Sequence, residues 1–158
     1  TALETIAELE IPTIAMVNGP CLGGGCLLAN ACDLRFAALD SAIFAIPVAR
    51  LGIILDDSNV QRLVNLIGQA KAKELLFSAA TIGSTRAATM GLINQAVEDD
   101  KLEAHTLEFA KTILANSSLT VAATKASIAR LNNHVREQER AIVGYLSSDF
   151  RNRMALEP

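Results

Sequence analysis

The stretch GPCLGGGCLLANACDL, residues 19–34, constrains the fold most, because three consecutive glycines stand directly before an apolar run. Glycine is unfavourable inside helices and strands, so a triplet indicates a tight turn or a close approach of the backbone to another group. Residues 11–19, opened by Pro12, are typical of a short buried strand. Residues 24–31 predict a helix, and residues 32–38 predict a second strand. The stretch therefore predicts a strand, helix, strand unit with its turn at the glycines.

From Ser58 onward the pattern is mainly helical. Ser58 and Gln61 have the spacing of a capping box, and Gly68 predicts the end of the helix that they begin. A short strand is expected at 92–97, after a stop at Gly91. Three long helices are expected at the C-terminal end, at about 100–115, 119–132 and 136–150.

The composition indicates one compact domain or a large piece of one, since 51% of the 158 residues are hydrophobic and the net charge is −3. Lys and Arg are scattered, which predicts no binding of nucleic acid or of an anionic membrane surface. No apolar run reaches the roughly 18 residues that a membrane-spanning helix needs. We therefore expect a cytoplasmic protein that binds small molecules or protein partners.

The cysteines and histidines do not suggest a metal site. Cys21, Cys26 and Cys32 lie in one apolar stretch without a CxxC pair, which favours buried small side chains over a disulfide framework or zinc. His105 and His134 stand in polar helical surroundings, so we expect both on solvated helix faces.

A strand that ends in a glycine turn and continues as a helix directs backbone N–H groups outward at the positive end of the helix dipole. Such a turn can hold a phosphate, a carboxylate or an oxygen that becomes negative during a reaction. The Lys-Ser or Lys-Thr of a phosphate loop and the G-x-G-x-x-G spacing of a dinucleotide site are both missing. Spacing alone leaves a purely structural turn and an anion-binding turn equally open.

The surrounding residues resemble the crotonase superfamily, the enoyl-CoA hydratase and isomerase group, over about residues 10–132. The stretches that carry the resemblance are IPTIAMVNGPCLGGGCLLANACDLRFAA, then FAIPVARLGI, then QRLVNLIGQAKAKELLFSAATIGSTRAATMGLINQAVEDDKLEAHTLEFAKTILANSSLTVAATKASI. The resemblance implies an α/β fold, with a partial ββα spiral core over 1–98 that contains the glycine turn. It implies a C-terminal helical trimerisation region over 99–158, and a homotrimer or a dimer of trimers.

The resemblance also implies an acyl-CoA thioester as substrate, with no other cofactor, and an enolate intermediate whose oxygen is held by two backbone N–H groups. One donor falls on Gly24, with Gly23 and Gly25 beside the substrate. The second donor of the family lies in an Ala-Gly-x-Asp-like turn on an earlier strand, which has no counterpart here. We therefore expect half of the oxyanion hole and most of the usual CoA-binding surface to be missing from this chain.

The two glutamates of the family's hydratases correspond to Leu27 and Val48. Together with Ile54, these residues are candidates to line an acyl pocket, although core packing explains each of them as well. Asp56 falls where related 3-hydroxyisobutyryl-CoA hydrolases carry a functional Asp. Adjacent acids at a helix start are usually caps, but Ser58 already offers a cap, so Asp56 is the first candidate general acid or base. We expect a raised pKa for Asp56, and Asp57 is the second candidate.

Two classes of function remain open. One is an acyl-CoA enzyme with a rearranged acid/base set, performing isomerisation, hydration, decarboxylation or thioester hydrolysis. The other is a non-catalytic acyl-CoA-binding or scaffolding relative. The glycine turn and the two acids favour the first class, and the replaced glutamates favour the second. On its own, the chain is expected to have negligible hydratase activity.

Overall fold

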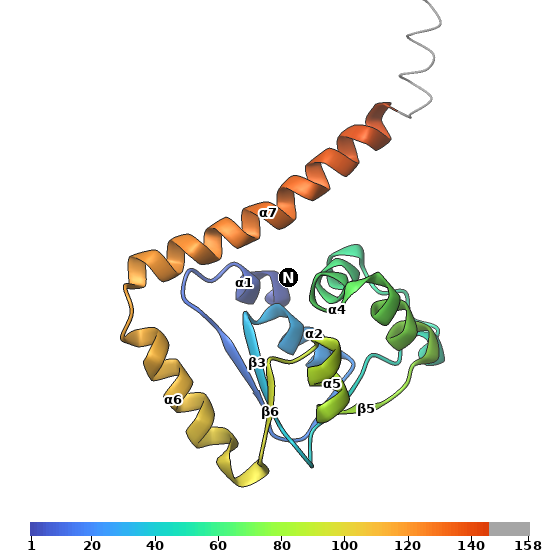
Figure 1. Cartoon of the computed structure of the whole chain (residues 1–158). Helices are drawn as coiled ribbons and strands as arrows, with labels where there is room; N and C mark the ends of the chain where they lie inside the picture. Colours follow the sequence, from blue (N-terminus) through green and yellow to red (C-terminus); the bar gives the residue numbers. More distant parts are fainter. Residues whose placement is uncertain (146–158) are drawn as a thin grey trace, which may run out of the picture. The chain divides into compact units, whose positions relative to one another are not determined.

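The computed structural model describes residues 1–145, with side chains described as far as Leu131 (Figure 1). The chain divides into two compact units, residues 1–116 and residues 117–158. The first unit holds every strand of the described residues, and the second begins one residue before the helix α7, Ser118–Tyr145.

Two small sheets organise the first unit. One has the strand order β1-β3-β6, all parallel, and the other has the order β2-β4-β5, in which β2 and β4 are parallel and β5 is antiparallel. The first sheet contains β1 (Ile14–Val17), β3 (Leu34–Ala38) and β6 (Gln95–Val97), and the second contains β2 (Pro20–Leu22), β4 (Ile43–Ala45) and β5 (Ile82–Gly83).

Two successive pairs of strands are each followed by a helix, as the predicted ββα repeat requires, whereas α5 separates β5 from β6. Strands β1 and β2 lead into α2 (Gly24–Ala31), and β3 and β4 lead into α3 (Val48–Leu51). Successive repeats stack in register, with Met16 beside Phe36 in one sheet and Cys21 beside Phe44 in the other. The remaining helices of this unit are α1 (Ala2–Ala7), α4 (Asp57–Ser78), α5 (Ser84–Met90), the single 3-10 turn η1 (Asp99–Lys101) and α6 (Leu102–Leu114).

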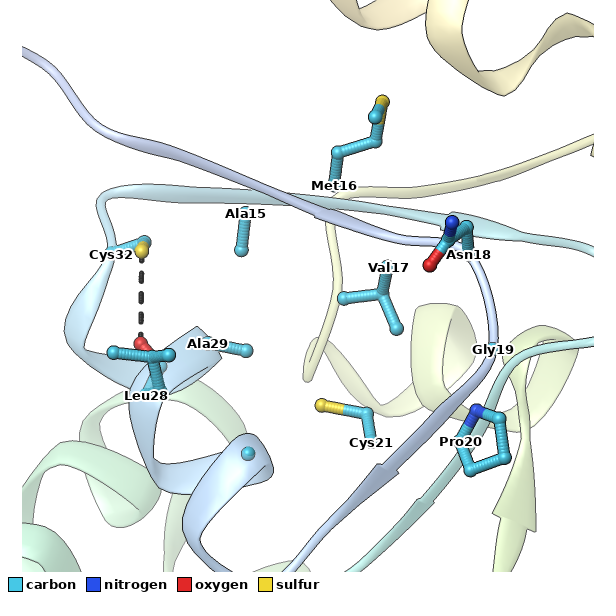
Figure 2. A pocket seen from close by; sticks show the side chains of 11 residues that line it. Ala15, Met16, Val17, Asn18, Gly19, Pro20, Cys21, Leu28, Ala29 and Cys32 are labelled. Carbon is cyan, nitrogen blue, oxygen red and sulfur yellow. Dashed lines mark hydrogen bonds between the residues drawn. The ribbon is translucent and has the colours of Figure 1, made fainter.

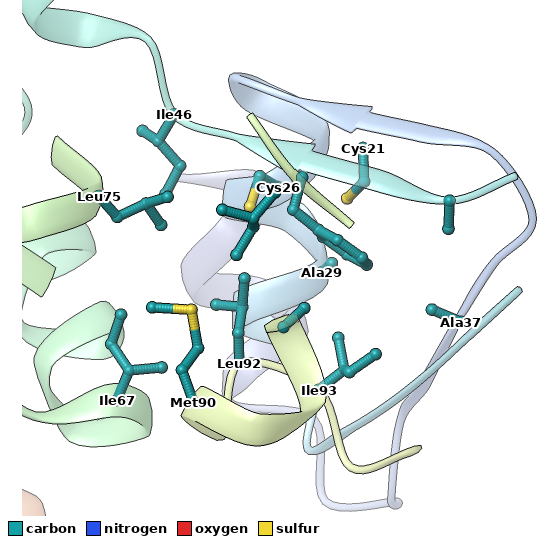
Figure 3. Close-up of a cluster of buried hydrophobic side chains, with 14 of the residues drawn as sticks. Cys21, Cys26, Ala29, Ala37, Ile46, Ile67, Leu75, Met90, Leu92 and Ile93 are labelled. Atoms are coloured by element: carbon teal, nitrogen blue, oxygen red, sulfur yellow. The ribbon is translucent and has the colours of Figure 1, made fainter. Parts of the chain in front are cut away.

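The core lies between the strands and the helices α2, α4 and α5 (Figure 3). Its large, fully buried side chains are Phe44, Ile46, Leu63, Leu75 and Leu92. The predicted stop in α4 is confirmed as a break, because Gly68 has a left-handed φ of 75° and a non-helical ψ of 163°. A second helix follows directly and runs to Ser78, so Gly68 ends the first of two helices that meet at a kink within α4.

Helix α6 packs on the first sheet. The ring of Phe36 on β3 meets the rings of His105 and Phe109 edge-on, at centroid distances of 5.0 and 5.1 Å. These contacts place α6 in the first compact unit, which ends at residue 116. The division into a spiral core over 1–98 and a trimerisation region over 99–158 stays a prediction. The prediction of a solvated helix face is wrong for His105, which is half-buried against the sheet. His134 lies outside the described side chains.

Helix α7 is continuous through residues 119–132 and on to Tyr145, where two helices were expected. Residues 132–136 contain neither proline nor glycine, so no strong helix breaker separates the two apolar patterns. The last part of the second expected helix, residues 146–150, lies outside the described residues. Within the described part of the chain, no helix is both long enough and apolar enough to span a bilayer.

Candidate functional site

The turn between β2 and α2 is built on Gly23. This residue has φ 51° and ψ −117°, a backbone conformation that residues with a Cβ rarely adopt. Its N–H donates to the carbonyl of Ala45 at 2.8 Å, and its carbonyl accepts from the N–H of Leu27 at 3.1 Å. Gly23 therefore joins the second sheet to the first turn of the helix, and its glycine is required by the backbone.

The next two glycines are different. Gly24 and Gly25 are the first two residues of α2, both exposed, and a Cβ built on either would meet no atom within 4 Å. Amide groups at the start of a helix have no partner within the helix, and they lie at the positive end of its dipole. The turn therefore presents unpaired N–H donors beside open space, which is the geometry that a carbonyl oxygen needs to approach.

A cavity of about 420 Å³ lies beside this turn, between β1 and α2 (Figure 2). We refer to it as the β1–α2 cavity; it is lined by residues 15–21 and by Gly25, Leu28, Ala29 and Cys32. Of the three glycines, only Gly25 lines it. The other residues predicted to contact substrate, Leu27, Val48 and Ile54, do not line this cavity.

Leu27 and Val48 are partly buried and pack against the hydrophobic core. The core interpretation is therefore confirmed for both. It is wrong for Ile54, whose side chain is 95% exposed because residues 53–56 connect α3 to α4 outside any helix or strand. A place for these residues in an acyl pocket stays a prediction.

Asp56 is the N-cap of α4. Its carboxylate accepts the backbone N–H of Asn59 at 3.0 Å, the Asn59 side-chain amide at 2.6 Å and the hydroxyl of Ser58 at 2.6 Å. The capping box predicted at Ser58 and Gln61 is therefore wrong, since the helix begins earlier and Ser58 donates to the true cap. The hydrogen bonds from Ser58 and Asn59 lower the pKa of Asp56 to about 2, so the expected raised pKa is also wrong.

Asp57 is the first residue of α4 and is exposed. An acid in the first turn complements the helix dipole, and its proposed role in proton transfer stays a prediction. Among the described residues, no three His, Cys, Asp or Glu side chains come together as a metal site would require.

Arg35 is a buried residue of this region that the sequence interpretation missed. It lies on β3, is 3% exposed, and donates to the carbonyls of Cys32 at 2.7 Å, Leu92 at 2.8 Å and Ala29 at 3.2 Å. Burial lowers the pKa of its guanidinium. The signal was present as a basic residue between two apolar residues in the predicted strand CDLRFAA. Arg35 ties the C-terminal end of α2, the helix that carries the glycine turn, to the loop before β6.

Comparisons with known proteins agree with this geometry. The family model described as Enoyl-CoA hydratase/isomerase matches residues 1–155. A short-chain-enoyl-CoA hydratase of Clostridium acetobutylicum is 41% identical over 122 residues, which is 77% of this chain and 46% of that protein. The chain thus spans about half the length of the curated relatives it matches.

Solved structures are similar over nearly the whole chain. An enoyl-CoA hydratase/isomerase family protein from Hyphomonas neptunium matches with a TM-score of 0.81 and 32% identity, covering 95% of this chain and 59% of that one. A methylmalonyl-CoA decarboxylase in complex with 2-nitronate-propionyl-CoA matches with a TM-score of 0.79 and 28% identity, covering 94% and 60%. The ββα repeat, the glycine turn and these matches lead to one conclusion: the chain belongs to the enoyl-CoA hydratase/isomerase family of the crotonase superfamily.

Proposed function

We propose that this protein acts on acyl-CoA thioesters and that the backbone N–H of Gly24 stabilises the negative oxygen of an enolate formed from the thioester. The observation that carries the proposal is that the amides at the start of α2 have no partner within the helix and that nothing lies within 4 Å of a Cβ built on Gly24. Donors aimed at a developing oxyanion contribute about 3 kcal/mol of transition-state stabilisation each. The thioester is the substrate, and the proposal requires no other cofactor.

The contrast between Gly23 and its neighbour supports this assignment. Gly23 needs its glycine for a left-handed φ, and its N–H is already paired with Ala45. Gly24 has no such backbone requirement and no close neighbour. Since the fold does not require glycine at position 24, we attribute it to a ligand that must come close to the backbone there.

The acid or base that moves the proton is assigned to Asp57 rather than to Asp56. The carboxylate of Asp56 accepts three hydrogen bonds and has a pKa of about 2, so it is a weak base at neutral pH. Asp57 is exposed at the same helix start. The positions of the hydratase glutamates hold Leu27 and Val48, so a simple two-glutamate addition of water is not proposed.

We further propose that the protein works as a homotrimer, or a dimer of trimers, in the cytoplasm. Leu107 and Leu114 on α6 are 54% and 82% exposed, and Leu119 and Leu131 on α7 are 80% and 69% exposed. Large apolar side chains that gather on exposed helices are typical of an interface with another subunit.

The decisive experiment separates the donor from the space in front of it. Gly24→Pro removes the N–H at the first helical position, where proline is well tolerated. Gly24→Ala keeps the N–H but puts a methyl group into the open space. Gly83→Ala is the matched control, because Gly83 also has no atom within 4 Å of a built Cβ, has an ordinary φ of −82°, and lies outside both the turn and the β1–α2 cavity. The three variants are compared with the unsubstituted protein on enoyl-, hydroxyacyl- and malonyl-type CoA thioesters.

We expect both Gly24 variants to lose turnover by about 100-fold or more, while Gly83→Ala stays close to the parent protein. Full activity in Gly24→Pro would rule out the Gly24 N–H as a donor. Binding of the thioesters without turnover by the parent protein would favour a non-catalytic acyl-CoA-binding relative instead.

A further inference from the structure

Two cysteine side chains flank the glycine turn. Cys21 lies on β2, and Cys26 lies in the first turn of α2, with Leu22 and the three glycines between them. Figure 3 shows both sulfur atoms in the same part of the core, between the strand and the helix. Cys26 is fully buried, whereas Cys21, at 6% exposure, also lines the β1–α2 cavity (Figure 2). A small molecule in this cavity therefore meets Cys21 before it meets Cys26.

The two thiols interact directly. The Cys26 thiol hydrogen-bonds to the sulfur of Cys21, which lowers the pKa of Cys21 although burial opposes the change. The same contact, together with burial, raises the pKa of Cys26. Cys21 is the sulfur that attacks first, because of the two thiols it alone lines the cavity from which an oxidant arrives, and the direction of its pKa shift favours the reactive thiolate.

We propose that Cys21 and Cys26 are a redox modification site, which forms a reversible disulfide across the glycine turn when the protein meets a peroxide. The Cys21 thiolate attacks one oxygen of hydrogen peroxide, the O–O bond breaks, and the released hydroxide leaves as water after taking up a proton. Cys21 is then a sulfenic acid. The sulfur of Cys26 attacks it, the S–S bond forms, and the S–O bond breaks with loss of a second water. Two thiols lose two electrons in total, and the peroxide is reduced to two waters.

The chain between the two cysteines can accommodate the bridge. A disulfide requires the two Cα atoms to lie about 4.4–6.8 Å apart, and small shifts of the backbone are needed when two thiols only touch. The three intervening glycines have wide backbone freedom, and a Cβ on any of them would meet nothing within 4 Å. Gly24 and Gly25 can therefore shift without displacing a packed neighbour, while Gly23 keeps its hydrogen bonds to Ala45 and Leu27.

Cys32 provides an internal control. It lies at the other end of α2, is half-buried, and its thiol donates to the carbonyl of Leu28 at 3.6 Å (Figure 2). It also lines the β1–α2 cavity, so the same oxidant reaches it. The proposal predicts that the contact between Cys21 and Cys26, and not access alone, selects the pair that is linked.

The bridge ties β2 to the first turn of α2 and so restrains the amide of Gly24. A loss of turnover on oxidation rests on the proposed function, whereas formation of the disulfide does not. The test below therefore measures the disulfide itself, and it remains decisive if the protein proves to have no acyl-CoA activity.

The test uses the positions at which trypsin cleaves the chain. Residues 1–34 contain no Lys or Arg, so trypsin releases residues 1–35 as one peptide that carries all three cysteines. The purified protein is treated with hydrogen peroxide, the peroxide is removed, the chain is unfolded in urea, its remaining thiols are alkylated with N-ethylmaleimide, and the peptide is sequenced by mass spectrometry. We expect three labels before oxidation and one after it, on Cys32. The oxidised peptide has lost two hydrogen atoms, and dithiothreitol restores all three labels.

Three variants make the assignment specific. Cys32→Ala should still form the link, whereas Cys21→Ala should not. In Cys26→Ala, Cys21 should stop at the sulfenic acid, which dimedone traps as a stable adduct. Retained labels on Cys21 and Cys26 in the peroxide-treated parent protein would overturn the proposal, as would a link from either residue to Cys32. The map of the parent protein decides the question even if a variant fails to fold.

Discussion

Replacing Arg35 tests how the helix that carries the glycine turn is held in place. Its guanidinium donates to four backbone carbonyls, and those of Ala29 and Leu92 belong to buried contacts. Arg35→Met keeps most of the length of the side chain but removes every donor. The carbonyls at the C-terminal end of α2 and in the loop before β6 then lose their shared partner.

The size of the effect follows from the buried contacts. The buried carbonyl of Leu92 is left without a partner, which costs about 1–3 kcal/mol. The carbonyl of Ala29 still accepts the N–H of Cys32 and loses only its hydrogen bond to the charged guanidinium, worth about 1.5–3 kcal/mol, so the two contacts together amount to roughly 2.5–6 kcal/mol. Removing a cation that burial disfavours offsets part of this cost. We expect a net loss of about 3 kcal/mol, which is a large share of the roughly 5–15 kcal/mol that stabilises an ordinary domain.

Thermal and urea unfolding followed by far-ultraviolet circular dichroism measure this loss directly. For a chain of this size, about 3 kcal/mol corresponds to a decrease in Tm of roughly 6–12 °C. Arg35→Lys is the matched control, because it keeps the charge but can satisfy fewer carbonyls, and it should fall between the parent protein and Arg35→Met. The reasoning is refuted if Arg35→Met changes the free energy of unfolding by less than about 0.5 kcal/mol, the range of ordinary surface substitutions.

Four further outcomes are expected. Asp56→Asn should leave turnover nearly intact, against the roughly 100-fold loss expected for a general base, and a loss of that size in a thioester assay would restore Asp56 as a catalytic group. The pKa of Asp56 is lowered from 3.8 to about 2 in the folded protein, so the ionised carboxylate stabilises the fold above pH 3.8 and this stabilisation is lost as the pH falls towards about 2. In acid unfolding, Asp56→Asn should therefore lack the loss of stability that the parent protein shows in this pH range. Light scattering at tens of micromolar should show an oligomer, and a clean monomer would contradict the exposed apolar faces of α6 and α7. This chain alone should not hydrate crotonyl-CoA at ordinary enzyme rates, which a spectrophotometric assay checks, because Leu27 and Val48 stand in place of the hydratase glutamates.

The parts of the fold that the sequence predicts well are those with local signals. The predicted helix at 24–31 is observed as α2, and β3 lies within the predicted 32–38. Gly68 and Gly91 both have the left-handed φ expected of helix stops. Glycine at such positions reflects a backbone requirement of the residue itself, so no knowledge of distant contacts is needed.

The strands of the second sheet could not be predicted in this way. Strands β2, β4 and β5 are only three, three and two residues long, too short for a period of two to stand out. They exist because successive repeats stack, as in the pairing of Cys21 with Phe44, and that pairing joins residues far apart in the sequence. The extended segment at 11–19 therefore continues past a bend into a second strand that the pattern did not reveal.

The site residues show the same division between features with a local signal in the sequence and features that depend on distant contacts. Asp56 was misassigned because the sequence offers two N-caps for the same helix, the Ser-x-x-Gln pattern and an Asp two residues earlier. Which of them becomes the N-cap depends on where the first turn of the helix packs. Arg35 was missed because a charged residue in a strand usually indicates an exposed edge, whereas here the backbone carbonyls of three segments surround it. Both errors concern hydrogen bonds that form only once the chain is folded.

The glycine turn allows the demands of the fold and of the proposed reaction to be measured separately. Gly23→Ala places a Cβ at a φ of 51°, which costs about 1–2 kcal/mol of stability. Gly24→Ala adds a better helix former to an exposed position with open space around it, so it should be neutral or stabilise the protein by up to about 0.5 kcal/mol. Urea unfolding measures both changes, and the thioester assay measures turnover in the same two samples. If Gly24→Ala is at least as stable as the parent protein but inactive, the glycine is retained at that position for the approach of the substrate. If Gly24→Ala is destabilised as much as Gly23→Ala, both glycines serve the backbone, and the proposed oxyanion donor loses its main support.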